Sequence, residues 1–437
     1  MNSQASSEND VRRILLECTE TYFLDVNTGI QRVVRNVARH SLDIGSQLGV
    51  ECQPIVRVGD RFHAVAWRGG APRTDSNWGK VRHGIRSMFH PLAPLARVPG
   101  VGWAGLLLRK LLFPRSLVRK ARRLRVSLSC PEIVPGRGDA ILLLDNWWNP
   151  DMWPLVARAK SNGATVNVVV YDLLPATHPE YFRPRLTNRF STCLKLALQQ
   201  GDRFLAISQH TCDALRQYAA ELRLRSDEGA AFQSFHLGAQ LDRVTDGGKV
   251  RQALTQAFEG DQATRPYLMV GTLEPRKNHA LLLDAFEQVW QSRPQTRVVI
   301  VGRFGWMSND LVKRILHHPQ YSRALFLFTN LVDSELEYCY RHARAFVFPS
   351  HAEGFGLPVV EALQHGLPVM ASDIPIHREV AGDFCAYFDQ HDPASLAKLI
   401  EDFEQRGAFA GVQPPRAYRS CDWRTSAQEL LQKCLAK

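Results

Sequence analysis

The sequence contains no uninterrupted apolar run of the roughly 18 residues that a transmembrane helix needs, so no membrane span is predicted. Its nine cysteines include no C-x-x-C pair and no metal-ligand spacing, which predicts reduced, mostly buried thiols. The first ten residues are polar and include Glu8 and Asp10, unlike a secretory signal. These absences favour the cytoplasm.

Acidic residues are absent between Asp75 and Glu132, whereas twelve Lys and Arg lie between Lys80 and Arg125. The net charge of +11 therefore belongs to this one segment, which also carries Trp103 and many leucines. Such a segment suits either an anionic membrane surface or packing on its own domain with a solvated basic face. Nucleic acid is not a predicted partner, because no nucleic-acid-binding fold accompanies the charge.

The 437 residues are 45% hydrophobic and 22% charged, as in an ordinary globular protein, and their number predicts two large domains. Apolar runs that suit buried strands alternate with segments of helical periodicity along both halves of the chain. Nearly continuous apolar strands are typical of parallel sheets covered on both faces. The polar, glycine-bearing interval 242–264 predicts the domain junction. We therefore predict an α/β protein with doubly wound sheets and a boundary near residue 245.

The segment from Glu353 to Leu363 combines a glycine-bearing turn with the start of a helix. An apolar strand at 345–349 leads into it, and Pro358 occupies the first helical turn, where proline is favoured. Free N–H groups at a helix N-terminus stabilise anions, and glycine lets a ligand approach the backbone. We predict that Glu353 faces a transferred group and that Glu361, about one turn inside the helix, accepts hydrogen bonds from ribose hydroxyls.

A second phosphate-binding pattern lies at 270–279, where a strand is followed by Gly271, then Arg276 and Lys277, and then a helix. Backbone approach, two cations and a favourable helix dipole are what a diphosphate requires. The pattern predicts that Arg276 and Lys277 bind a diphosphate.

Two strands of the first half end in an aspartate. Asp145 and Asp172 follow the apolar runs 140–144 and 165–171. In open α/β sheets the ligand crevice lies beyond the carboxyl ends of the strands, so both side chains are predicted to face it. Gly29 follows the first strand and begins a helix; a contact in the same crevice and a simple helix cap are the two interpretations of it.

Three of these stretches resemble one family. The interval from Glu353 to Glu361 resembles the E-x7-E motif of the large family-4 glycosyltransferases. The stretch at 270–279, Val-Gly-Thr-Leu-Glu-Pro-Arg-Lys-Asn-His, resembles their phosphate-binding loop. The segment 172–182, Asp-Leu-Leu-Pro-x-x-His-Pro-Glu-Tyr-Phe, is similar to a loop of the bacterial members that build O-antigens and exopolysaccharides, many of which use GDP-mannose.

The resemblance implies two Rossmann-like domains facing across a cleft, the GT-B type of fold. The first domain would span 11–245, with a basic insertion at about 80–130, and the second would span 246–420 and bind the nucleotide sugar. The resemblance also allows a terminal helix at 421–437 to cross back onto the first domain.

The resemblance also implies roles for individual residues. Glu353 and His178 would be catalytic, although a purely structural role is the alternative for His178. The implied donor-binding residues are Arg276, Lys277, Glu361, Gly271, Thr272, Gly302, Val332, Phe355, Gly356 and Leu357. The implied cleft or acceptor residues are Gly29, Arg32, Asp145 and Asp172.

The implied reaction is a retaining transfer of a hexose, with mannose from GDP-mannose as the best match, to a lipid-linked or saccharide acceptor in bacterial surface polysaccharide synthesis. No D-x-D triplet occurs, so neither a metal nor another cofactor is expected. The alternatives are UDP-glucose, UDP-N-acetylglucosamine or dTDP-rhamnose as donor, a catalytically silent nucleotide-sugar-binding subunit, and another enzyme on the same scaffold. A lipid-linked acceptor would place the protein in the cytoplasm or at the inner face of the cell membrane.

Overall fold

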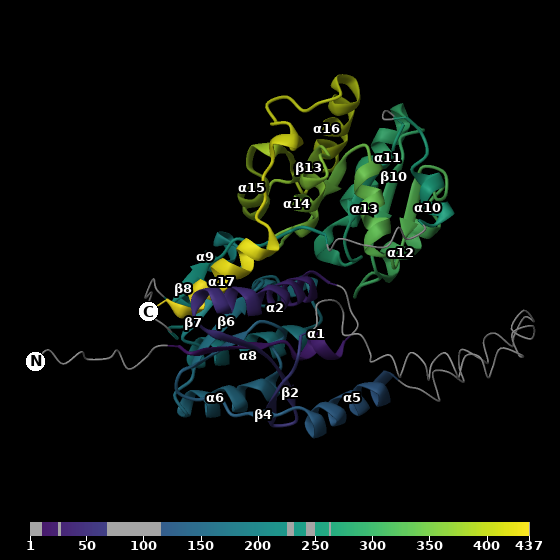
Figure 1. Cartoon of the computed structure of the whole chain (residues 1–437). Helices are drawn as coiled ribbons and strands as arrows, with labels where there is room; N and C mark the ends of the chain where they lie inside the picture. The colour runs from purple at the N-terminus through teal and green to yellow at the C-terminus, as the bar shows by residue number, and fades with distance from the viewer. Residues whose placement is uncertain are drawn as a thin grey trace, which may run out of the picture. The chain divides into compact units, whose positions relative to one another are not determined.

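Two β-sheets carry the fold in a computed structural model of the chain (Figure 1). The structure describes residues 11–24, 28–67, 115–224, 231–241, 250–261 and 264–436. Most of the basic segment predicted at 80–125, up to residue 114, lies outside the described residues. Two compact units contain the described residues: unit 1 within Met1–Val169, Gln199–Arg203 and Leu430–Lys437, and unit 2 within Val170–Leu198 and Phe204–Glu429.

The first sheet has eight strands in the order β4-β3-β2-β1-β5-β6-β7-β8. Its central strand β1 runs parallel to both neighbours, β2 and β5, whereas β3 is antiparallel to β2 and to β4. The strands are β1 (Arg13–Glu17), β2 (Glu51–Val58), β3 (Arg61–Ala64), β4 (Glu132–Ile133), β5 (Asp139–Leu143), β6 (Thr165–Val170), β7 (Arg203–Ala206) and β8 (Phe232–Ser234).

The second sheet has six strands in the order β11-β10-β9-β12-β13-β14, and every pair is parallel. Its strands are β9 (Tyr267–Val270), β10 (Val298–Val301), β11 (Leu325–Phe328), β12 (Phe346–Phe348), β13 (Val369–Ser372) and β14 (Cys385–Phe388). Alternate residues of β10 belong to different apolar clusters, with Val298 and Ile300 in one and Val299 and Val301 in the other. This sheet is therefore buried on both faces, which explains its continuous apolar strands.

Helices connect the strands as expected for parallel pairing. No helix of the described residues is both long and apolar enough to cross a membrane. The α-helices are α1 (Thr19–Phe23), α2 (Gly29–Leu48), α5 (Arg115–Ser129), α6 (Trp153–Ser161), α7 (Leu174–Thr177), α8 (Pro184–Gln200), α9 (Gln209–Glu221), α10 (Gln252–Ala257), α11 (His279–Ser292), α12 (Asn309–Leu316), α13 (Asp333–His342), α14 (Leu357–Gln364), α15 (Pro375–Ala381), α16 (Pro393–Arg406) and α17 (Trp423–Leu435).

The predicted α/β class is confirmed, with two largely parallel sheets and alternating helices. The domain boundary near residue 245 stays a prediction, because 242–249 lie outside the described residues. Terminal helix α17 contacts earlier segments within each unit: the Trp423 indole donates to the Gln240 carbonyl (2.8 Å), and Arg203 donates to the Cys434 carbonyl (3.5 Å).

Candidate active site

The turn between β12 and α14 carries the predicted catalytic carboxylate. Gly356 caps the N-terminus of α14 with φ +93°, a left-handed conformation that favours glycine. Leu357 begins the helix, and Pro358 follows within its first turn as predicted. Glu353 lies just before this cap, and the residue is only 6% exposed.

The loop after β9 brings the two predicted cations to the same place. A short 3-10 helix at Pro275–Lys277 follows Gly271 and Thr272. Asn278 then adopts φ +54°, and its side chain accepts a hydrogen bond from Leu281 N–H at the start of α11. This cap ends the loop, so the positions of Arg276 and Lys277 are fixed between two regular elements.

Both cations form ion pairs with Glu353. Arg276 Nη1 lies 2.7 Å from Glu353 Oε2, and Lys277 Nζ donates to Glu353 Oε1. Arg276 also pairs with Glu274 (Nε to Oε1, 2.6 Å), and its Nη1 donates to the Ala352 carbonyl at 3.1 Å. The two loops at the carboxyl ends of β9 and β12 are thus held together by a buried network in which the charges balance.

Electrostatics in this network favour the ionised carboxylate. Burial alone would raise the pKa of Glu353, but Arg276 and Lys277 outweigh it and lower this pKa to about 2. Burial lowers the pKa of Lys277, and Glu353 opposes that fall. Burial likewise raises the pKa of Asp172, which Arg276 opposes, so Asp172 lies within electrostatic reach of the network.

The arrangement suits a site that exchanges one anion for another. Arg276 and Lys277 present charge-assisted donors, the kind that bind phosphate oxygens most strongly. In the protein alone these donors are taken by Glu353. A diphosphate would therefore compete with Glu353 for the same cations and release its carboxylate for another partner.

Glu361 lies inside α14 and is 2% exposed. Its Oε2 accepts a hydrogen bond from the Tyr340 hydroxyl at 2.8 Å, a partner that the sequence gives no signal for. Its predicted role as a ribose acceptor stays a prediction. Gly302 and Gly271 stand at the ends of β10 and β9, and a Cβ built on Gly302 would lie 1.8 Å from the Gly271 carbonyl oxygen. Only glycine fits at position 302.

Apolar side chains are exposed after the carboxyl ends of β10 and β11. Phe304 and Met307 follow β10, Val332 follows β11, and all three are more than half exposed. An exposed apolar surface beside parallel strand ends suits the flat face of a nucleobase. Of these three residues, only Val332 was predicted to bind the donor. The sequence gives no signal for Phe304 and Met307 except that both follow a strand.

The predicted His178 loop packs beside the Glu353 turn within unit 2. Tyr181 stacks between His178 and His351, with ring centroids 6.2 Å and 5.5 Å away. The Trp306 indole donates to the Tyr181 carbonyl at 2.6 Å. Phe182 of the same loop belongs to an apolar cluster with Ala352. The histidine is therefore held by Tyr181, a residue of the same motif, and Tyr181 is held in turn by His351 and Trp306, which lie outside the motif.

Gly354 lies where the Glu353 turn packs against the residues that follow β6. A Cβ built on it would lie 2.1 Å from the Tyr171 carbonyl oxygen. Its own carbonyl accepts hydrogen bonds from the hydroxyls of Ser208 (2.9 Å) and Thr211 (3.2 Å). No side chain larger than hydrogen fits at this position without moving the backbone.

The remaining predicted residues, Gly29, Arg32 and Asp145, lie in unit 1. Gly29 is the first residue of α2 and Arg32 is buried in its first turn. Asp145 is fully buried after β5, and its Oδ2 accepts a hydrogen bond from Thr21 N–H at 2.5 Å. Burial and Asp145 together raise the pKa of the neighbouring strand-end residue Glu17 to about 8, so unit 1 contains a buried pair of carboxyl groups.

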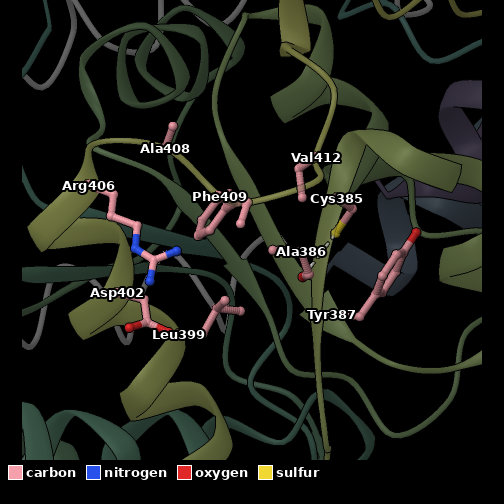
Figure 2. Close-up of a pocket in the computed structure, with 10 residues that line it drawn as sticks. Cys385, Ala386, Tyr387, Leu399, Asp402, Arg406, Ala408, Phe409 and Val412 are labelled. Atoms are coloured by element: carbon pink, nitrogen blue, oxygen red, sulfur yellow. Dashed lines mark hydrogen bonds between the residues drawn. The ribbon is translucent and has the colours of Figure 1, made fainter.

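Two cavities in unit 2 lie apart from these residues. Figure 2 shows one of about 310 Å³, with Asp402 and Arg406 of α16 on one side and Cys385 and Tyr387 of β14 on the other. The other, of about 460 Å³, is lined by Asp373, Tyr387, Phe388, Asp389, Gln390, His391 and Ser395. None of the candidate residues lines either cavity. Among the described residues no cluster of three or more His, Cys, Asp or Glu could hold a metal ion, and the expected metal independence stays a prediction.

Comparison with known proteins identifies the family of the second half. Residues 253–411 match the model of the family Glycosyl transferases group 1, so the chain contains a glycosyl transferases group 1 domain. This domain includes Arg276, Lys277, Glu353 and Glu361, and it is consistent with the family-4 resemblance. His178 lies outside the matched range.

Curated relatives include mannosyltransferases of O-antigen synthesis. The chain is 35% identical over 258 residues to the serotype-specific mannosyltransferase WbdA of Escherichia coli, covering 58% of this chain and 31% of WbdA. It is 25% identical over 239 residues to the O-antigen chain mannosyltransferase RfbU of Salmonella typhimurium, covering 54% of this chain and 60% of RfbU. The matches thus span about a third of WbdA and three fifths of RfbU.

Solved structures with similar folds have GT-B architecture. The Anabaena protein HepE in complex with UDP and glucose matches with a TM-score of 0.54 at 15% identity, covering 97% of this chain and 95% of HepE. The α,α-trehalose 6-phosphate synthase of Burkholderia multivorans matches with a TM-score of 0.55 at 13% identity, covering 97% of this chain and 98% of the synthase. The predicted GT-B type of fold is confirmed.

We expect Glu353→Gln to lower the free energy of unfolding at pH 7 by on the order of 3 kcal/mol, because Arg276 and Lys277 would stay buried without their shared carboxylate. The pKa of Glu353 is lowered on folding, so its ion pairs stabilise the protein above the ordinary pKa of 4.5 and lose this effect as the pH falls toward 2. Urea unfolding should show the gap between wild type and variant shrinking over that range. The surface carboxylate Glu337, paired with Arg341, gives the control Glu337→Gln, which should change stability little. A gap that does not depend on pH would contradict the assignment.

The opposite pH dependence is expected at Glu17, whose pKa is raised to about 8 by burial and by Asp145. The folded protein binds a proton there that the unfolded chain releases above pH 4.5, so wild-type stability falls between pH 4.5 and 8. Glu17→Gln mimics the protonated carboxyl and should become more stable relative to wild type across this range. Melting temperatures at both ends of the range test this, with the exposed Glu51→Gln as control; parallel curves for wild type and Glu17→Gln would rule it out.

Proposed function

We propose that the protein is a retaining glycosyltransferase that moves mannose from GDP-mannose to a lipid-linked or saccharide acceptor in bacterial surface polysaccharide synthesis. The observation that carries the proposal is the buried ion-pair network of Glu353 with Arg276 and Lys277, inside the glycosyl transferases group 1 domain. The O-antigen mannosyltransferase relatives and the segment 172–182 support mannose as the sugar.

In the proposed reaction the donor diphosphate binds Arg276 and Lys277 and takes the place of the Glu353 carboxylate. The two cations and the N-terminus of α14 stabilise the charge that develops on the leaving diphosphate, so the proposal includes no metal ion. The released Glu353 binds hydroxyls of the sugar and stabilises its oxocarbenium-like transition state.

Retention follows from a front-face reaction. The bond between the anomeric carbon and the diphosphate oxygen breaks, and the acceptor oxygen forms its bond on the same face. The departing diphosphate oxygen accepts the acceptor hydroxyl proton. Glu361 binds the ribose, the apolar surface of Phe304, Met307 and Val332 contacts the base, and His178 contacts the donor sugar. A lipid-linked acceptor would place this reaction at the inner face of the cell membrane.

A panel of nucleotide sugars tests the donor. GDP-mannose is expected to raise the melting temperature more than UDP-glucose, UDP-N-acetylglucosamine or dTDP-rhamnose, since a ligand at 100 times its dissociation constant stabilises by about 2.7 kcal/mol. The shift should be equal with magnesium and with a chelator. Addition of a lipid-linked oligosaccharide should then release GDP. Binding without release would indicate a silent binding subunit, and no shift with any donor would refute the proposal.

Two variants should separate the roles of the carboxylates. Glu353→Gln is expected to lose most of kcat while its affinity for the nucleotide is kept or rises, because Arg276 and Lys277 still bind the diphosphate and no longer have to release the Glu353 carboxylate. Glu361→Ala is expected to weaken nucleotide binding first. Initial rates and calorimetric affinities, measured at a temperature where both variants are folded, give the comparison, with Glu337→Gln as a control of unchanged activity. Equal losses of kcat and affinity in Glu353→Gln would count against its role.

A further inference from the structure

Helix α5 exposes an apolar face. Leu124 and Leu128 are 61% and 79% exposed, and their spacing of four residues puts them on one face, which Ala121 continues. Val126 lies between them in sequence but on the opposite face, and it is 6% exposed. The helix therefore exposes Leu124 and Leu128 and buries the smaller Val126.

The buried face of α5 is fixed to unit 1 by its own contacts. The helix packs against α1 and β2. Arg123 lies over the Phe23 ring, 5.3 Å from its centroid, and 3.8 Å from a carboxylate oxygen of Glu20. Unit 1 thus determines which face of the helix points outward, and the exposed leucines are not the result of a free rotation.

Basic side chains accompany the exposed leucines on α5. The helix carries no acidic residue, and three of its basic side chains, Arg119, Lys120 and Arg125, are exposed, whereas Arg122 and Arg123 are partly buried. Lys120 lies one turn before Leu124 on the same side of the helix and is exposed. Apolar side chains flanked by cations are the arrangement that binds an anionic lipid surface, where each cation adds about 1 kcal/mol.

We propose that the outward face of α5, built on Ala121, Leu124 and Leu128, docks the protein on an anionic membrane. A protein partner fits less well, because a stable interface covers roughly 800 Å² on each side and a single stripe with two leucines offers far less. The proposal deepens the proposed function by naming the surface that would bring the protein to the membrane, and it does not depend on which sugar is transferred. Its failure would leave the donor assay unaffected.

Flotation of the full chain with lipid vesicles tests the docking face. Wild type is expected to bind vesicles that contain phosphatidylglycerol, to bind pure phosphatidylcholine weakly, and to dissociate as salt rises. The double variant Leu124→Ser/Leu128→Ser should lose at least about tenfold in binding to the anionic vesicles, because two leucine side chains no longer leave water. Both positions are exposed, so the melting temperature and donor binding should not change.

The matched control is Leu42→Ser on α2, another exposed leucine of unit 1 (52%), which should bind like wild type. Equal binding by the double variant and wild type would overturn the proposal, as would wild-type binding that does not prefer anionic lipid. A wild-type dimer in solution that the double variant abolishes would also overturn it, because a second copy of the chain would then cover this face.

Discussion

The site depends on one carboxylate, Glu353, that pairs with two buried cations. Without Glu353, Arg276 would keep Glu274 as a partner, but Lys277 would lose its ion pair, and an unpaired buried charge costs several kcal/mol. The loops after β9 and β12 therefore hold each other in position. The same pairing keeps the cations charged and oriented for an incoming anion, so stability of the protein and readiness for a ligand come from one interaction.

Much of the fold could be predicted because its central strands are buried on both faces. Continuous apolar runs such as 140–144 admit few other interpretations, and β5 lies where this run places it. The antiparallel edge was missed because β3 has four residues and β4 only two, too short to show a pattern. Helix α10 was missed because the interval around it is rich in polar residues and glycine.

The residues of the candidate site were predictable only where a motif combines residue type with position. Arg276, Lys277 and Glu353 follow strand ends and precede helices, so they could be assigned to one anion site. Their mutual ion pairs could not be predicted, because a sequence does not state which side chains meet. The contact of Tyr340 with Glu361 could not be predicted for the same reason, and neither could the stacking of Tyr181 on His351, although Tyr181 belongs to the motif at 172–182.

Gly354 has a consequence for how such sequences are interpreted. Because its alpha carbon faces the Tyr171 carbonyl at close range, folding alone requires glycine there. Folding also requires a left-handed backbone conformation at position 356, which favours glycine. A descendant that had lost its catalytic power could therefore still retain both glycines, and their retention would record architecture and not turnover.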